Sequence, residues 1–183
     1  MSGIDAAAME ELEEFYRDLE KRLDPLRALH QERLRCGAGC ADCCVDGITV
    51  FGIEADRIRR RRAGILDGEE PAPVGVCAFL DGGGRCRIYE DRPYVCRTQG
   101  LPLRWIERRP DGMVAEMRDI CPRNEEGPPV EALDAGACWT LGPFEGRLAG
   151  LQAAVDGGEG SRVPLRSLFR RGAALPPEGG KKT

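Results

Sequence analysis

Nine cysteines are the residues of this sequence best suited to chemistry, and its 183 residues contain only one histidine, His30. Thiolates bind zinc, iron and iron–sulfur clusters, and they also act as nucleophiles and redox groups. A catalytic zinc site of the histidine-rich kind needs two or three imidazoles, so this class is excluded. A hydrolase would depend on His30 alone, and this residue falls in a helical pattern where we interpret it as a solvated surface histidine. Any metal should therefore be held mainly by sulfur.

Four of the cysteines form a short motif, Cys36-x3-Cys40-x2-Cys43-Cys44. On a helix, this spacing places the four sulfurs along one stripe. In a loop, the intervening glycines allow tight turns, so that the sulfurs can converge on one ion. Neighbouring side chains diverge, which makes Cys43 and Cys44 awkward ligands for the same tetrahedral ion. The pair therefore indicates two metal positions or a polynuclear cluster.

Cys77 and Cys86 flank the clearest hairpin signal, two apolar-rich runs separated by Asp-Gly-Gly-Gly at residues 81–84. With this loop, Leu80 faces Arg85, and Cys86 lies diagonally from Cys77 on the same face of the hairpin. A register shift of one residue would send the two sulfurs to opposite faces. The even register therefore predicts Cys77 and Cys86 as a ligand pair.

The other cysteines are Cys96, Cys121 and Cys138. Eight thiolates fill two four-cysteine sites, and we interpret Cys138 as the spare, because it comes last and in a helix-like context. Two zinc ions with eight thiolates would add further negative charge to a chain whose formal net charge is −4. Nearby arginines are candidates to offset this charge as donors to sulfur, and solvated surface positions are the alternative. They are Arg85, Arg87, Arg92 and Arg97.

The composition indicates one loop-rich domain. The chain has 24 glycines and 13 prolines, and only 5% of its residues are aromatic, so we expect a thin core that metal binding helps to stabilise. The N-terminal residues show no secretion signal, and no run approaches the roughly 20 apolar residues of a membrane span. We predict a cytoplasmic protein without membrane contact. In that reducing compartment, clustered cysteines indicate metal binding ahead of disulfides or free redox thiols.

Helices and hairpins should position the cysteines. Apolar residues recur every three or four positions from Asp5 to Arg35, which predicts an amphipathic helix that Pro25 kinks or divides in two. The other expected elements are a short helix over 54–62, a hairpin of 101–107 with 113–118, and a C-terminal helix that begins near Pro143. The predicted fold class is α+β and mainly helical, a small cysteine-rich metal-stabilised domain with short β-hairpins and irregular loops.

We divide the chain into four segments. These are an N-terminal helical segment at 1–35, a cysteine-cluster metal-binding core at 36–122, a C-terminal helical segment at 123–171, and a disordered tail at 172–183. The tail assignment follows from a composition rich in glycine, proline and lysine.

The order of the motifs resembles the YkgJ-like cysteine-cluster family, whose domain is described as chelating zinc or iron. The match covers about residues 36–122 and includes the string Cys-x-Ile-Tyr-Glu-x-Arg-Pro-x2-Cys-Arg that begins at Cys86. The resemblance implies that zinc or iron is bound, the iron as ions or as an iron–sulfur cluster, and that the eight matching cysteines are ligands. They are Cys36, Cys40, Cys43, Cys44, Cys77, Cys86, Cys96 and Cys121. Residues that would frame the site are Tyr89, Arg92, Pro93 and Arg97, with Pro93 aiming Cys96.

Two further functions stay open. The first three cysteines also resemble the cluster motif of radical S-adenosylmethionine enzymes, and some cysteine-cluster relatives are linked to flagellin lysine N-methylation. Two features argue against an enzyme of this kind. Asp42 precedes the third cysteine, where these enzymes usually have an aromatic residue, and their barrel needs a longer chain than this one. Arginine runs at 57–62 and 162–171 suggest a zinc knuckle that binds nucleic acid, but the pI of about 5.3 argues against that partner. The sequence predicts no catalytic residue, substrate or protein partner.

Overall fold

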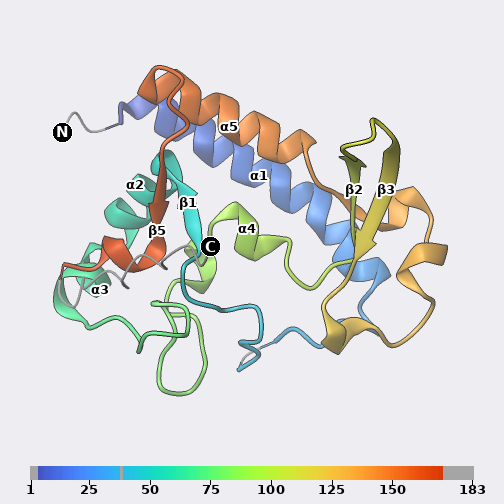
Figure 1. Ribbon diagram of the computed structural model, residues 1–183. Helices are drawn as coiled ribbons and strands as arrows, with labels where there is room; N and C mark the ends of the chain where they lie inside the picture. The colour runs from blue at the N-terminus through green and yellow to red at the C-terminus, as the bar shows by residue number, and fades with distance from the viewer. Residues whose placement is uncertain (1–3, 38, 171–183) are drawn as a thin grey trace, which may run out of the picture.

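Two long helices lie side by side and run in opposite directions along one side of the molecule (Figure 1). They are α1 (Ala6–Leu29) and α5 (Pro143–Asp156). The computed structural model describes residues 4–37 and 39–170. The predicted disordered tail at 172–183 lies outside the described residues, and the segment boundaries stay a prediction. Within the described ranges, no helix is long and apolar enough to cross a membrane.

The first helix, α1, is capped by Asp5, whose side chain accepts a hydrogen bond of 2.7 Å from the backbone N–H of Ala8. The helix continues through Pro25 to Leu29, so the predicted division into two helices is wrong. Pro25 removes one backbone donor, but it is exposed, and the carbonyl that loses its partner can bond to water. The buried apolar face of the helix outweighs this single lost bond.

His30 follows α1 and is buried, with 6% of its surface exposed, so the prediction of a solvated surface histidine is wrong. Its Nε2 atom lies 2.7 Å from the carbonyl oxygen of Ala137. Its backbone N–H closes the helix by donating to the carbonyl of Leu26 at 3.0 Å. The helical pattern placed His30 at the helix end, whereas the covering segment comes from a distant part of the chain.

Two small sheets complete the fold. β1 (Thr49–Phe51) pairs antiparallel with β5 (Arg162–Pro164). β2 (Leu103–Arg108) pairs antiparallel with β3 (Val114–Asp119) and parallel with β4 (Trp139–Thr140). The β2–β3 hairpin was predicted, and with the helices it confirms the α+β class. Neither of these described sheets closes into the barrel that the S-adenosylmethionine alternative requires.

Three shorter helices connect these elements. They are α2 (Gly52–Arg61), α3 (Ala63–Gly68) and α4 (Tyr94–Arg97). The helix predicted over 54–62 is confirmed as α2. The predicted start of the C-terminal helix is also confirmed, because Pro143 lies in the first turn of α5, where its missing N–H costs no helical hydrogen bond.

The apolar core has two clusters, one that includes Phe15 and another that includes Phe79. Glu54 of α2 is buried, with 3% of its surface exposed. Its carboxylate accepts hydrogen bonds from the hydroxyl of Tyr16 at 2.7 Å and from the backbone N–H of Tyr94 at 2.8 Å. These bonds hold α1, α2 and α4 together, and α4 carries one of the candidate ligand cysteines.

Candidate metal centre

Seven cysteines line a single cavity of about 770 Å³. They are Cys36, Cys40, Cys43, Cys44, Cys77, Cys86 and Cys96. All nine cysteines of the chain are free thiols. The described residues that line the cavity include no carboxylate and no imidazole, so a metal in it would meet a donor set of sulfur.

The rest of the cavity wall is largely apolar and includes Ile48, Phe79 and Leu165. Arg85 and Arg92 are its cationic residues among those described. Metal-ligating side chains are those of cysteine, histidine, aspartate and glutamate. In the described part of the chain, no group of three or more of them lies close enough together to hold an ion. The thiols are therefore distributed over the wall of the cavity.

The first four cysteines lie in successive turns after α1, which is the loop alternative of the sequence analysis. The N–H of Cys40 donates to the carbonyl of Gly37 at 3.0 Å, and the N–H of Cys44 donates to that of Ala41 at 2.9 Å. Gly39 has a φ of +87°, a left-handed conformation that favours glycine. Tight turns of this kind allow closely spaced side chains to line one cavity.

Asn124 connects Cys36 with Cys121. Its side-chain amide donates to the Cys36 sulfur at 3.3 Å and to the carbonyl of Gly100 at 2.7 Å. Its side-chain oxygen accepts from the N–H of Arg35 at 2.8 Å, and its own N–H donates to the Cys121 carbonyl at 2.7 Å. Asn124 is fully buried. Sequence reasoning missed it, although it is the one asparagine of the chain and lies three residues after a predicted ligand.

Gly100 gives Cys36 the space that it occupies. A Cβ atom at position 100 would lie 2.5 Å from the Cys36 sulfur and 3.1 Å from the Asn124 amide nitrogen. Gly100 also has a φ of +90°, which disfavours any larger residue. Both the backbone conformation and the close approach therefore require glycine here.

The predicted hairpin between Cys77 and Cys86 forms only as an isolated bridge, between Leu80 and Cys86. The prediction paired Leu80 with Arg85, so its register was wrong by one residue. Both cysteines nevertheless line the cavity. The segment after Cys77 is a turn, in which the N–H of Leu80 donates to the Cys77 carbonyl at 3.0 Å. Side chains alternate between two faces only along an extended strand, so strand register does not decide where Cys77 and Cys86 point.

Cys96 lies in α4, and Pro93 caps that helix. The N–H of Cys96 donates to the Pro93 carbonyl at 3.0 Å, so Pro93 does shape the turn that presents Cys96. The Arg92 guanidinium lies 3.7 Å from the ring centroid of Tyr89 and donates to the Cys96 carbonyl at 3.4 Å. Tyr89, Arg92 and Pro93 all line the cavity, and their framing role stays a prediction.

Arg87 and Arg97 contact other groups than sulfur. Arg87 pairs with Glu69 at 2.7 Å, and Arg97 pairs with Glu20 of α1 at 2.6 Å. Arg97 also donates to the backbone carbonyl of Arg92 at 2.7 Å. It therefore stabilises the backbone of a residue that lines the cavity. The other two arginines of the predicted set line the cavity itself.

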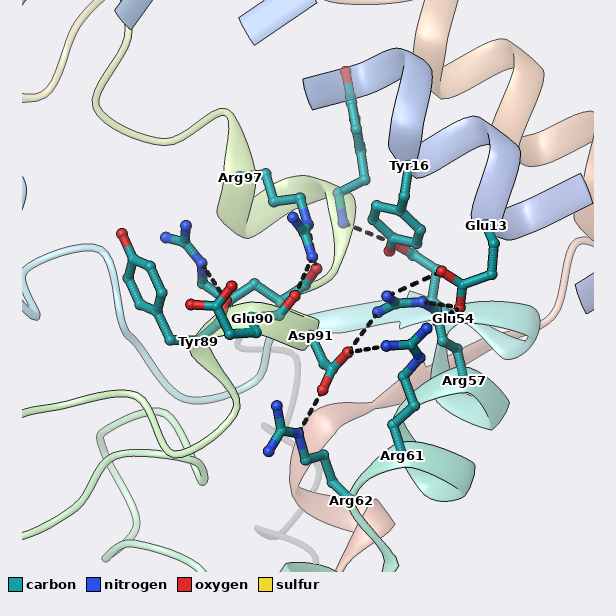
Figure 2. Close-up of polar contacts among 12 residues, drawn as sticks. Glu13, Tyr16, Glu54, Arg57, Arg61, Arg62, Tyr89, Glu90, Asp91 and Arg97 are labelled. Carbon is teal, nitrogen blue, oxygen red and sulfur yellow. Dashed lines mark hydrogen bonds and ion pairs between the residues drawn. The ribbon is translucent and has the colours of Figure 1, made fainter. Parts of the chain in front are cut away.

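Figure 2 shows a buried carboxylate, Asp91, surrounded by two arginines of α2 and the arginine that follows this helix. They are Arg57, Arg61 and Arg62. Arg57 is itself buried and pairs with Glu13 of α1 at 2.8 Å. The network holds the 3-10 turn η1 (Tyr89–Asp91), which leads into α4, against α1 and α2. Sequence reasoning missed Asp91 because it occupies an unspecified position of the cysteine string.

The arginine runs that suggested nucleic-acid binding are largely engaged within the protein. In the second run, Arg166 is buried and pairs with Asp46 at 2.9 Å. The guanidinium of Arg162 lies 4.4 Å from the ring centroid of Phe51. Arg171 lies outside the described residues. With the Asp91 network, these contacts leave fewer arginines to meet a phosphate backbone.

The cavity thiols differ in their readiness to ionise. A hydrogen bond from the Cys44 thiol lowers the pKa of Cys43 to about 6, and donating that bond raises the pKa of Cys44. Burial raises the pKa of Cys96 to about 12 and also raises the pKa of Cys77 and of Cys86. Metal binding by the buried thiols must therefore release protons.

The last two cysteines have different environments. Cys121 directly precedes the 3-10 turn η2 (Pro122–Asn124) and reaches the Cys36 region through Asn124. Cys138 is buried between the 3-10 turn η4 (Ala135–Ala137) and β4, and its sulfur lies 3.9 Å from the Arg118 guanidinium. Cys138 is absent from the cavity wall as described. This position fits its interpretation as the spare cysteine.

The cavity and its thiols place the protein in the class of cysteine-rich metal-binding proteins. Residues 35–122 match the model of the CxxCxxCC family, described as a putative zinc- or iron-chelating domain. This match confirms the resemblance to a cysteine-cluster family that the motif order indicated. Comparison with curated proteins and with solved structures gives no match.

Proposed function

We propose that this is an iron–sulfur protein in which eight cysteines hold the iron. The proposed ligands are Cys36, Cys40, Cys43, Cys44, Cys77, Cys86, Cys96 and Cys121. The cavity carries the proposal, because seven thiols surround a space of about 770 Å³. A single zinc ion lies about 2.3 Å from each of its four sulfurs and needs almost no free volume. A larger space with thiols on its wall favours a polynuclear cluster.

The surrounding residues suit such a group. Ile48, Phe79 and Leu165 give part of the wall an apolar surface beside the sulfurs. Arg85 and Arg92 bring positive charge to a set of thiolates that would otherwise carry a large negative charge. When bound, the metal would supply a cross-link between loops that have little regular secondary structure of their own. The chain itself would position the sulfurs.

We also place the protein in the cytoplasm, where reducing conditions keep the thiols available for iron. The described contacts support neither of the alternatives. The described sheets form no barrel for S-adenosylmethionine chemistry, and the described arginines of the two runs have partners within the protein. Enzymatic activity therefore has no part in the proposed function.

The test is anaerobic purification from iron-replete cells, followed by metal analysis and a visible absorption spectrum. We expect a brown protein that contains iron and acid-labile sulfide. Removal of the metal should lower the thermal unfolding midpoint measured by circular dichroism. A colourless protein that carries only zinc would overturn the iron–sulfur assignment, and a protein without stoichiometric metal would overturn metal binding altogether.

A pair of cysteine variants provides the matched control. Cys96→Ser removes a thiol that lines the cavity, and we expect it to lose iron. Cys138→Ser removes a thiol that is also shielded from solvent, with 5% of the residue exposed, but that lies away from the cavity. We expect Cys138→Ser to keep the iron content of the unaltered protein. Equal iron in both variants would contradict the assignment of Cys96.

A further inference from the structure

Asn124 is the point at which three distant segments of the chain meet. Its side-chain amide donates to the Cys36 sulfur at 3.3 Å and to the carbonyl of Gly100 at 2.7 Å, and its side-chain oxygen accepts from the N–H of Arg35 at 2.8 Å. A backbone N–H can only donate and a carbonyl can only accept, so the amide oxygen must face Arg35 and the amide nitrogen must face Gly100. These contacts fix the orientation of the amide in a site where Asn124 is fully buried.

The backbone beside this amide is held by contacts that do not involve the Cys36 sulfur. The guanidinium of Arg33 donates to the carbonyl of Asn124 at 2.8 Å and to that of Glu125 at 3.3 Å. Arg33 is itself buried, with 7% of its surface exposed. The N–H of Asn124 donates to the Cys121 carbonyl at 2.7 Å. Both backbone groups of Asn124 are therefore bonded, and the position of the amide does not depend on its bond to the sulfur.

Cys36 needs such a partner because it is exposed, so the packing of neighbouring residues does not fix its side chain. Gly100 leaves room for the sulfur at one place, since a Cβ atom on this glycine would lie 2.5 Å from it. Among the described residues, Asn124 supplies the one side-chain hydrogen bond to the Cys36 sulfur. The glycine and the amide together hold in place a thiol that would otherwise sample several rotamers.

We infer that Asn124 is a positioning residue for the metal, whose amide holds the Cys36 sulfur and, when that sulfur is a ligand, withdraws electron density from it. The inference rests on the proposed function, because it assumes that Cys36 binds metal. A hydrogen bond to a ligand sulfur stabilises the reduced, more negatively charged form of an iron–sulfur cluster, so it raises the reduction potential. Asn124 therefore acts on the iron without contacting it, as other residues do that orient metal ligands.

The first measurement uses the unaltered full chain, so it does not depend on the folding of a variant. Asn124 is the one asparagine of the chain, so labelling asparagine with ¹⁵N marks this residue alone. The labelled protein is loaded with ¹¹³Cd, a thiolate-binding ion whose nuclear spin couples through a ligand sulfur to a proton that is hydrogen-bonded to this sulfur. We expect a splitting on one of the two side-chain N–H protons and none on the other, which faces Gly100. A loaded protein without any splitting would overturn the inference.

The second measurement is the reduction potential of the iron form, taken on the molecules that retain the cluster. Asn124→Ala removes the hydrogen bond to sulfur, and we expect a lower potential than in the unaltered protein. Arg33→Lys is the matched control, because it weakens the clamp on the same turn but keeps the positive charge and the amide of Asn124. Both variants should lower the urea midpoint of unfolding, and only Asn124→Ala should change the potential. An unchanged potential in Asn124→Ala, or an equal shift in both variants, would contradict the inference.

The outcomes separate the inference from the proposed function. A protein that binds neither iron nor cadmium would show that the proposed function is wrong. A protein isolated with zinc alone would overturn the iron–sulfur assignment, and the cadmium spectrum would still test the role of Asn124. Metal binding without the splitting would overturn the inference and leave the proposed function standing.

Discussion

The side-chain amide of Asn124 lies 3.3 Å from the sulfur of Cys36, and the backbone N–H of the same residue donates to the Cys121 carbonyl at 2.7 Å. One fully buried residue thus spans two proposed ligands that are far apart in the sequence. A hydrogen bond from an amide favours the ionised thiolate, which is the form that binds metal. The relationship makes Asn124 a test of metal binding that leaves every cysteine in place.

Replacement of Asn124 should weaken both the fold and the binding of metal by the proposed ligands Cys36 and Cys121. Asn124→Ala leaves the N–H of Arg35 and the carbonyl of Gly100 without a partner in a buried site, which costs about 1 to 3 kcal/mol. Asn124→Asp keeps the acceptor but brings negative charge to Cys36, so we expect it to lose more metal than Asn124→Ala. Urea unfolding and metal analysis check this. Full metal content in Asn124→Asp would contradict the positioning role.

Gly100→Ala should also weaken metal binding at Cys36. The added Cβ would lie 2.5 Å from the Cys36 sulfur, in a backbone conformation with a φ of +90°. Gly146→Ala is the control, because this glycine lies inside α5 and a Cβ added there would have no heavy atom of a neighbouring residue within 4 Å. Alanine there should stabilise the helix by up to about 1 kcal/mol. If both variants kept the same metal content, the close approach at Gly100 would have no functional role.

Asp91→Ala should destabilise the protein by about 3 kcal/mol, because it removes the buried partner of Arg57. Loss of this carboxylate also loosens η1 and so the turn that presents Cys96. Arg61→Ala is the matched control, since the Arg61 side chain is 50% exposed and its loss should cost about 1 kcal/mol or less. Urea unfolding distinguishes the two, and equal destabilisation would show that Asp91 is not the centre of the network.

Asp156 should make stability depend on pH. Its carboxylate accepts hydrogen bonds from the N–H of Ser161 at 2.7 Å and from the Gln152 side chain at 2.8 Å, and these bonds lower its pKa. A lowered pKa in the folded state means that the stabilisation is present at neutral pH and is lost as the pH falls below the ordinary value of about 4.

The measurement compares urea unfolding of the unaltered protein with that of Asp156→Asn from pH 7 down to pH 3. We expect the variant to be less stable at pH 7 and the difference to shrink toward pH 3. Acid also releases metal from thiolates, but this affects both proteins, so the difference between them isolates Asp156. A difference that is constant over this range would contradict the prediction.

Local patterns in the sequence predicted the elements that depend on local forces. The β2–β3 hairpin followed from its turn residues, and α5 followed from Pro143 and an apolar face. The register of the segment from Cys77 to Cys86 was wrong, because a turn after Cys77 replaced the expected strand. The burial of His30 was also missed, because the segment that covers it lies about a hundred residues further along the chain.

The sequence by itself determined the kind of chemistry, since nine cysteines and a single histidine leave sulfur as the main ligand. It also indicated two metal positions or a polynuclear cluster, through the adjacent pair Cys43 and Cys44. Only the tertiary structure decided which thiols are neighbours, because that depends on long-range contacts such as those of Asn124 and Asp91. A buried hydrogen bond or ion pair between distant segments leaves no periodic trace in the sequence, so its partners become visible only when the chain has folded.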